Sequence, residues 1–182
     1  IRTVKLKCGK DRQLGAARID AVRSNFPGLN IRIDPNQSWD VAWAAEHLRS
    51  LKPFNIQYCE EPLPNGTSFD EYRRLGERGE VAIALDESIV DLKSAELAIE
   101  KRAADYFVLK LQRFGGMDRL LDVAGFAQSC QVGSVLASNM VAAVGLAVGL
   151  HGAAVMQTPG LDSGLATSDF FAGGLDPLLA VV

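Results

Sequence analysis

Cysteine and histidine are scarce in this chain, and no stretch of it stays apolar for long. The 182 residues contain three cysteines and two histidines, and no two cysteines stand at the close spacing typical of zinc sites. Their odd number fits reduced thiols, so we expect a cytoplasmic protein. The longest apolar stretch, Val141–Leu150, is shorter than the roughly 20 residues that span a bilayer. We therefore expect a buried helix there and no membrane partner.

Concentrated positive charge is missing as well. The formal net charge is -3, and the 19 lysines and arginines are scattered along the chain. Because nucleic acid is bound by basic stripes or patches, we expect no nucleic-acid partner. What the chain does have is 48% apolar residues in a length sufficient for a buried core, which favours one domain over residues 1–182.

Short apolar runs alternate with helical patterns along the chain. The runs that we expect to be strands each end on a polar residue, and they are Thr3–Lys7, Ile31–Asp34, Ile56–Glu60, Ala82–Asp86, Tyr106–Lys110 and Val132–Ser138. The helices expected between and after them are Ala16–Phe26, Val41–Leu51, Phe69–Leu75, Leu92–Ile99, Met117–Ala127 and Ala142–Ala154.

Strict alternation of strand and helix predicts an α/β fold with a parallel sheet and crossover helices. The regular repeat favours a (β/α) barrel of the TIM type over an open doubly wound sheet. A seventh strand is expected near Thr158–Leu161. Because a closed barrel has eight strands, we expect this chain to lack at least one βα unit.

Ionisable side chains recur at the ends of the predicted strands. Asp34, Glu60 and Asp86 close three consecutive strands, Lys7 closes the strand before them, and Lys110 closes the strand after them. The steps from Lys7 are 27, 26, 26 and 24 residues, about the length of one strand, one helix and two loops. Since the C-terminal ends of parallel barrel strands converge on one face, this spacing predicts one pocket for all five groups.

The three carboxylates supply only oxygen, which is the ligand type that a hard cation such as Mg²⁺ prefers, with Mn²⁺ as an alternative. The strand period of two places Lys5 and Lys7 on one face. Burial and a neighbouring positive charge lower the pKa of a lysine, so that the neutral amine can act as a base near neutral pH. We expect Lys110 to face Lys7 from the opposite side.

This set of groups suits removal of a proton from the carbon next to a substrate carboxylate, with the cation stabilising the enediolate. Two plainer interpretations stay open at this point. A single carboxylate at a strand end is commonly a helix cap or a partner in a loop salt bridge. The lysines could decorate a solvated edge strand.

A family resemblance rests on motifs at all five of these positions. The chain resembles the barrel domain of the enolase superfamily, in its muconate lactonizing enzyme subgroup. The motifs that carry the resemblance are Lys5-Leu6-Lys7, Asp34-Pro35-Asn36, Glu60-Glu61-Pro62, Asp86-Glu87-Ser88 and Leu109-Lys110. The resemblance implies Mg²⁺ as the cofactor and a small-molecule carboxylate as the substrate. It implies that the metal ligands are Asp34, Glu60 and Asp86, with Glu61 the less favoured member of its pair.

The same resemblance implies roles for the remaining polar groups. Lys7 and Lys110 would be the two catalytic lysines on opposite sides of the substrate, and Lys5 would tune Lys7. Asn36 and Glu87 would surround the metal ligands. Substrate would be bound by Ser138 and Asn139.

Within the subgroup, the stretch that begins at Ser138-Asn139 and the run Gly164–Thr167 resemble the o-succinylbenzoate synthases of menaquinone biosynthesis. That resemblance implies a lyase that eliminates water from a cyclohexadiene carboxylate. Related enzymes often carry a glutamate where this chain has Met140 and Val141. N-succinylamino acid racemases, dipeptide epimerases and muconate cycloisomerases share the lysines and the ligands, so an isomerase stays an alternative.

Members of this family also carry an N-terminal α+β capping domain and a first barrel strand that precedes the lysine pair. We expect neither within residues 1–182, so that the chain would be a partial C-terminal barrel domain. A catalytically silent barrel fragment is therefore a further alternative from another functional class. Exposed edge strands favour association, so we also expect a homo-oligomer.

Overall fold

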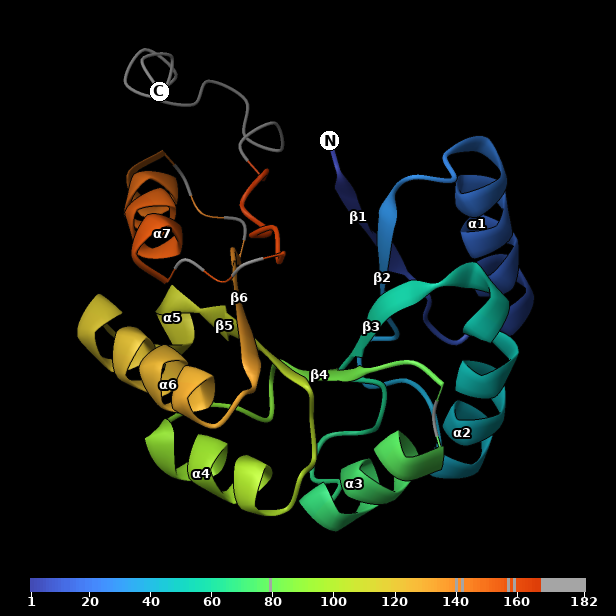
Figure 1. The fold of residues 1–182 in the computed structure, drawn as a ribbon, viewed down its shortest axis with the longest axis horizontal. Coiled ribbons are helices and arrows are strands. Elements are labelled where there is room, and N and C mark those ends of the chain that lie inside the picture. The colour runs from blue at the N-terminus through green and yellow to red at the C-terminus, as the bar shows by residue number, and fades with distance from the viewer. Residues whose placement is uncertain (79, 140, 142, 157, 159, 168–182) are drawn as a thin grey trace.

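One curved sheet of six parallel strands, with helices covering its outer side, makes up the computed structural model of this chain (Figure 1). The structure describes residues 1–78, 80–139, 141, 143–156, 158 and 160–167. Neighbouring strands in the sheet follow one another in the sequence, so each crossover leads to the adjacent strand. The strands are β1 Thr3–Lys7, β2 Asn30–Asp34, β3 Ile56–Glu60, β4 Ile83–Leu85, β5 Tyr106–Lys110 and β6 Gly133–Ala137.

Each predicted helix is confirmed; four begin at the predicted residue, and the other ends differ from the prediction by one to four residues. Helix α1 starts at Arg12, earlier than predicted, because the Asp11 side chain caps it by accepting a hydrogen bond from Leu14 N. A 3₁₀ turn, η1 (Lys52–Phe54), and a short helix, α5 (Leu111–Phe114), were not predicted. The others are α1 Arg12–Asn25, α2 Val41–Ser50, α3 Phe69–Arg78, α4 Leu92–Glu100, α6 Met117–Ser129 and α7 Ala143–Met156.

The prediction of a seventh strand near Thr158–Leu161 is wrong for the part of that range that the structure describes. Gly160 has a φ of +77° and forms a turn, and the Thr158 hydroxyl donates to the Ser134 carbonyl. The chain instead meets β6 three residues later, through a single parallel bridge between Ala137 and Gly164. Pro159 lies outside the described residues.

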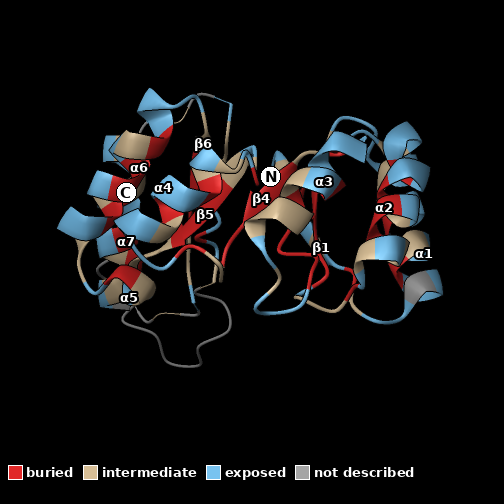
Figure 2. Ribbon diagram, turned by 90° about the horizontal axis from the view of Figure 1, so that it is seen from below, coloured by how far each residue is buried: buried red, intermediate tan, exposed pale blue. Residues whose placement is uncertain are grey.

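The core has two parts, one on each face of the sheet. Buried residues concentrate in the strands and on the helix faces that look toward them (Figure 2). Outward-facing side chains such as Ile33, Leu85 and Leu109 pack against the helices. A smaller cluster fills the concave side and contains Tyr58, Ala84, Val108 and Val135. Because side chains alternate along a strand, the groups at the strand ends are fixed on the concave side by this packing.

Helix α7 departs from the buried helix that we expected. It packs against β6 and α6, yet Val144 and Val155 on its outer side are 67% and 65% exposed. In the described part of the chain, no helix combines the length and apolar character needed to cross a membrane.

Candidate active site

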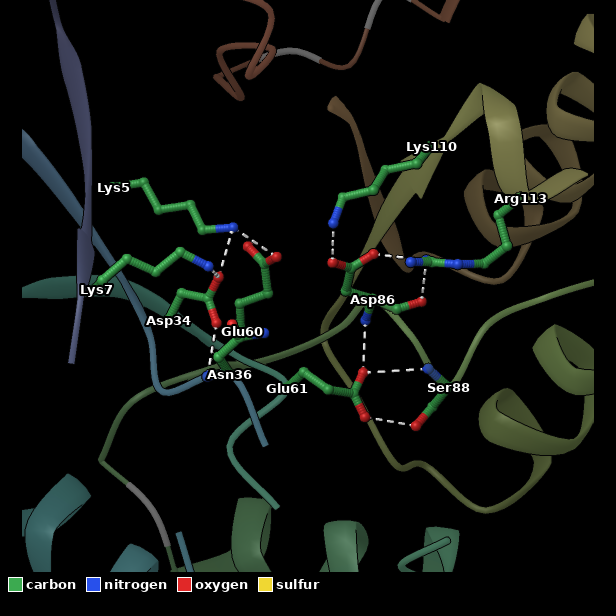
Figure 3. A network of polar contacts seen from close by, with 10 residues as sticks. All are labelled: Lys5, Lys7, Asp34, Asn36, Glu60, Glu61, Asp86, Ser88, Lys110 and Arg113. Carbon is green, nitrogen blue, oxygen red and sulfur yellow. Dashed lines mark hydrogen bonds and ion pairs between the residues drawn. The ribbon is translucent and has the colours of Figure 1, made fainter. Parts of the chain in front are cut away.

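The lysines and carboxylates predicted from strand-end spacing lie together on the concave side of the sheet (Figure 3). Strand register places Lys7 of β1 beside Asp34 of β2. Glu60 ends β3, and Asp86 directly follows β4. Figure 3 shows the β1 lysines on one side of the carboxylates and Lys110 of β5 on the other.

Two lysines converge on one carboxylate at the first side of the site. Lys5 Nζ lies 2.8 Å from Asp34 Oδ2 and 2.6 Å from Glu60 Oε1. Lys7 Nζ donates to the same Asp34 oxygen at 2.6 Å. Asp34 and Glu60 are buried, whereas the Lys7 side chain is 61% exposed. Lys5 thus bridges two strands, and Lys7 keeps access to the solvent side of the site.

The other side of the site is built around Asp86. Its carboxylate accepts from Lys110 Nζ and from the Arg113 guanidinium, which also donates to the Asp86 carbonyl at 2.6 Å. Sequence reasoning missed Arg113. Its position three residues after Lys110 in the short helix α5 turns it back toward the strand ends, and only the recognition of α5 could have revealed that.

The buried carboxylates dominate the electrostatics around Lys5. Burial lowers the pKa of Lys5, but the nearby Glu60 and Asp34 carboxylates outweigh burial and raise it above its ordinary value. The expectation that one amine of the pair lowers the pKa of the other stays a prediction. Burial would raise the pKa of Asp34, but Lys5 and Lys7 together hold it below its usual value.

The buried carboxylate of Glu60 is only partly compensated by its neighbours. Burial, together with the negative charges of Asp34 and Asp86, raises its pKa to about 7 against the opposing effect of Lys5. Among the described residues, no partner donates to the buried Glu60 Oε2 atom. A buried acceptor that lacks a donor, on a carboxylate influenced by two other negative charges, suits a cation.

The three predicted ligands do not converge as one group. In the described part of the chain, no three His, Cys, Asp or Glu side chains stand close enough together to hold a metal ion. Asp34 and Glu60 come together around Lys5, and Asp86 is held by Lys110 and Arg113. The metal ligands stay a prediction, which the oxygen-only donor set and the orphaned Glu60 oxygen support.

The residues predicted to surround the ligands act in different ways. The Asn36 backbone amide donates to Asp34 Oδ1 at 2.8 Å, with a φ of +56° at Asn36. Glu87 is half-buried, and its pKa is raised by burial and by the Asp86 charge. Glu61 points away from Glu60 into a separate buried network with Tyr72 and the chain that follows Asp86.

An open cavity of about 990 Å³ borders the lysines. Ser138 and Asn139, predicted to contact substrate, both line it, as do Lys5, Lys7 and Lys110. The Ser138 hydroxyl lies 3.2 Å from the Thr167 hydroxyl, so the segment after α7 forms part of the same wall. Met140 lies outside the described residues.

The comparisons with known proteins agree on one family. Residues 1–176 match the model of the enolase C-terminal domain-like family. An o-succinylbenzoate synthase of Thermobifida fusca is 36% identical over 185 residues, which cover 98% of this chain and 56% of that protein. A D-Ala-D/L-Ala epimerase of Cytophaga hutchinsonii is 32% identical over 160 residues, which cover 85% of this chain and 42% of that protein.

A solved structure has the same architecture. The dipeptide epimerase from Cytophaga hutchinsonii, complexed with Mg and the dipeptide D-Ala-L-Val, superposes with a TM-score of 0.82 at 29% identity. The superposition covers 92% of this chain and 45% of the epimerase chain. This chain therefore spans about half the length of the relatives that it matches.

Proposed function

This chain belongs to the enolase C-terminal domain-like family, and from that premise we propose that it removes a proton from the carbon next to a substrate carboxylate with the help of Mg²⁺. Its relatives include a lyase and an epimerase, which are enzymes of different reaction classes. The observation that carries the proposal is the placement of amines on both sides of three buried carboxylates (Figure 3).

Asp34, Glu60 and Asp86 would hold the metal in this proposal. Their donor atoms are carboxylate oxygens, and the buried Glu60 Oε2 atom lacks a donor among the described residues. When bound, Mg²⁺ supplies the positive charge that stabilises the negative charge developing on the substrate carboxylate. Mn²⁺ has the same preference for oxygen and is the natural spectroscopic substitute.

The lysines would carry out the proton transfers. For a dehydration, Lys7 takes the proton and then, as its ammonium, assists departure of the hydroxyl from the same face, while Lys110 stabilises the enediolate from the other face. For a racemisation, Lys7 and Lys110 act as two bases on opposite faces. Lys5, bound to both Asp34 and Glu60, sets the charge beside Lys7.

We propose dehydration to o-succinylbenzoate as the reaction. Support comes from the synthase of Thermobifida fusca, whose similarity extends over 98% of this chain, against 85% for the epimerase. Racemisation or epimerisation of an acylated amino acid or dipeptide is the second candidate, because a dipeptide epimerase superposes closely. Cycloisomerisation of a muconate uses the same chemistry and is the third.

Incubation in deuterated water separates these reactions. For a synthase, the cyclohexadiene carboxylate should be dehydrated rapidly, and an N-succinylamino acid should gain no deuterium at its α-carbon. Incorporation of deuterium at the α-carbon of the N-succinylamino acid, together with its racemisation, would identify the protein as a racemase or epimerase instead. Measurements should use the complete gene product, because the match covers only part of each relative.

The competing hypothesis of a silent barrel is tested by magnesium binding alone. Calorimetric titration of the wild-type protein should show saturable binding, which the Asp86→Asn variant should lose. If the complete gene product binds no magnesium, the enzymatic proposal is wrong.

A further inference from the structure

Glu61 has one of the most heavily bonded carboxylates in the site, yet none of the roles above uses it. It is 2% exposed. Its Oε1 atom accepts hydrogen bonds from the Tyr72 phenol, at 2.8 Å, and from the Ser88 hydroxyl. Its Oε2 atom accepts from the backbone amides of Asp86, at 2.7 Å, and Ser88, at 3.3 Å. All four donors are neutral groups, and one belongs to the predicted ligand Asp86.

The backbone of Glu61 makes two more connections between strand ends. Its amide donates to the Ala84 carbonyl in β4 at 2.9 Å, and its carbonyl accepts from the Gln37 amide at 2.8 Å. Gln37 belongs to the turn that directly follows Asp34. The φ of Glu61 is +38°, in the left-handed region that residues other than glycine rarely adopt. Such a conformation persists only where surrounding bonds enforce it.

We infer that Glu61 is a positioning residue that fixes the relative placement of the three strand ends carrying Asp34, Glu60 and Asp86. It follows Glu60 directly, it bonds the turn after Asp34 through its carbonyl, and it bonds the Asp86 amide through its carboxylate. The role in metal binding rests on the proposed function. The bonds themselves are present in the structure whether or not that proposal holds.

The chemistry of the four donors makes the inference specific. A backbone amide can only donate, so an acceptor must face Asp86 N and Ser88 N. The hydroxyls of Tyr72 and Ser88 can either donate or accept. Glutamine can therefore replace Glu61 with its carbonyl oxygen toward the two amides and its NH₂ group toward the two hydroxyls. Alanine leaves both amides without their acceptor, which releases the chain around Asp86.

The experiment measures Mn²⁺ binding to Glu61→Ala and Glu61→Gln in the complete gene product. Changes in groups that orient metal ligands weaken metal affinity by about 10- to 100-fold. We expect that loss in Glu61→Ala, together with a broadened Mn²⁺ electron paramagnetic resonance spectrum as the ligand geometry becomes heterogeneous. The glutamine variant should bind within about threefold of wild type. Leu75→Ala is the control, because it destabilises the same helix as Tyr72 through a buried apolar side chain and should leave affinity unchanged.

Each alternative outcome gives a distinct answer. If wild type binds Mn²⁺ and Glu61→Ala binds equally tightly, the positioning role is wrong and the proposed function stands. If wild type binds no Mn²⁺, both are wrong. A glutamine variant that binds Mn²⁺ as weakly as the alanine variant would also overturn the inference, because the placement of the strand ends would then not depend on an acceptor at position 61. If Glu61→Ala does not fold, Glu61→Asp replaces it, since a carboxylate shortened by one methylene cannot keep both sets of bonds and should bind Mn²⁺ more weakly.

Discussion

Replacement of Lys5 by methionine removes the cation that two buried carboxylates share. Lys5 Nζ contacts Asp34 Oδ2 at 2.8 Å and Glu60 Oε1 at 2.6 Å. Hydrogen bonds that involve a charged group contribute about 1.5 to 3 kcal/mol each. The Lys5 side chain is 34% exposed, so solvent screening reduces the sum of the two by about half. We expect Lys5→Met to lower the free energy of unfolding by about 1.5 to 3 kcal/mol in EDTA.

Magnesium should restore part of the stability that the Lys5→Met variant loses in EDTA. A divalent cation bound by Asp34 and Glu60 competes with the Lys5 ammonium for the same oxygens. Two unit charges 4 Å apart near a protein surface interact by about 4 kcal/mol, and about 1.4 kcal/mol already corresponds to a tenfold change in affinity. We therefore expect Lys5→Met to bind magnesium at least about tenfold more tightly than wild type. Saturating magnesium should then reduce the difference in free energy of unfolding between the variant and wild type.

Urea unfolding followed by tryptophan fluorescence measures both effects, once in EDTA and once in magnesium. Lys52→Met is the matched control, because Lys52 makes a 2.8 Å contact with Glu80 on the surface, where its side chain is 65% exposed. The control should change stability by less than about 1 kcal/mol. A Lys5→Met protein as stable as wild type in EDTA, or one that magnesium fails to stabilise, would refute the reasoning.

Three further predictions concern single side chains. Lys7→Ala should reduce turnover at least about 100-fold. Magnesium affinity should stay within a few-fold, because among the described residues Lys7 forms an ion pair with Asp34 only, and its 61% exposed side chain is screened by solvent more than that of Lys5; steady-state kinetics and calorimetry on one preparation can check both. Asp34→Ala should reduce both turnover and magnesium affinity, and unchanged affinity would remove Asp34 from the ligand set. Asp91→Ala should lower the free energy of unfolding by about 1 kcal/mol at neutral pH, because Asp91 caps α4. Its pKa is lowered by the Ser94 amide and hydroxyl, so this contribution is present above about pH 4 and should disappear in urea titrations as the pH falls below the lowered pKa.

Spacing alone was enough to predict the parallel sheet and the placement of the lysines and carboxylates at its strand ends. Parallel strands joined by crossover helices end on the same face, so residues about one βα unit apart are brought together regardless of which helix side chains lie between them. That is why Lys7 and Asp34 were correctly expected to be neighbours, and they are paired in register. The pattern failed near Thr158–Leu161, where Gly160 adopts a left-handed conformation and forms a turn.

Contacts that depend on side chains from turns and short helices could not be predicted in this way. Arg113 reaches Asp86 because α5 turns immediately after Lys110. Glu61 is held by Tyr72 from α3 and by the turn that follows Asp86. The pKa of Lys5 depends on which carboxylates its flexible side chain reaches, and Lys7, the nearest charge in the sequence, does not decide it.

The bases and the metal ligands of the proposed function are not independent groups. Lys5 and Lys7 both donate to Asp34 Oδ2, and Lys110 donates to Asp86. An ammonium that donates to a carboxylate has no lone pair with which to accept a proton from substrate. Lys7 and Lys110 can therefore act as bases only when Asp34 and Asp86 have another partner. The carboxylates can bind a cation without Lys7, so Lys7→Ala should impair catalysis alone. Asp34→Ala removes a proposed ligand of the cation that the proposed reaction requires, so it should impair both metal binding and catalysis.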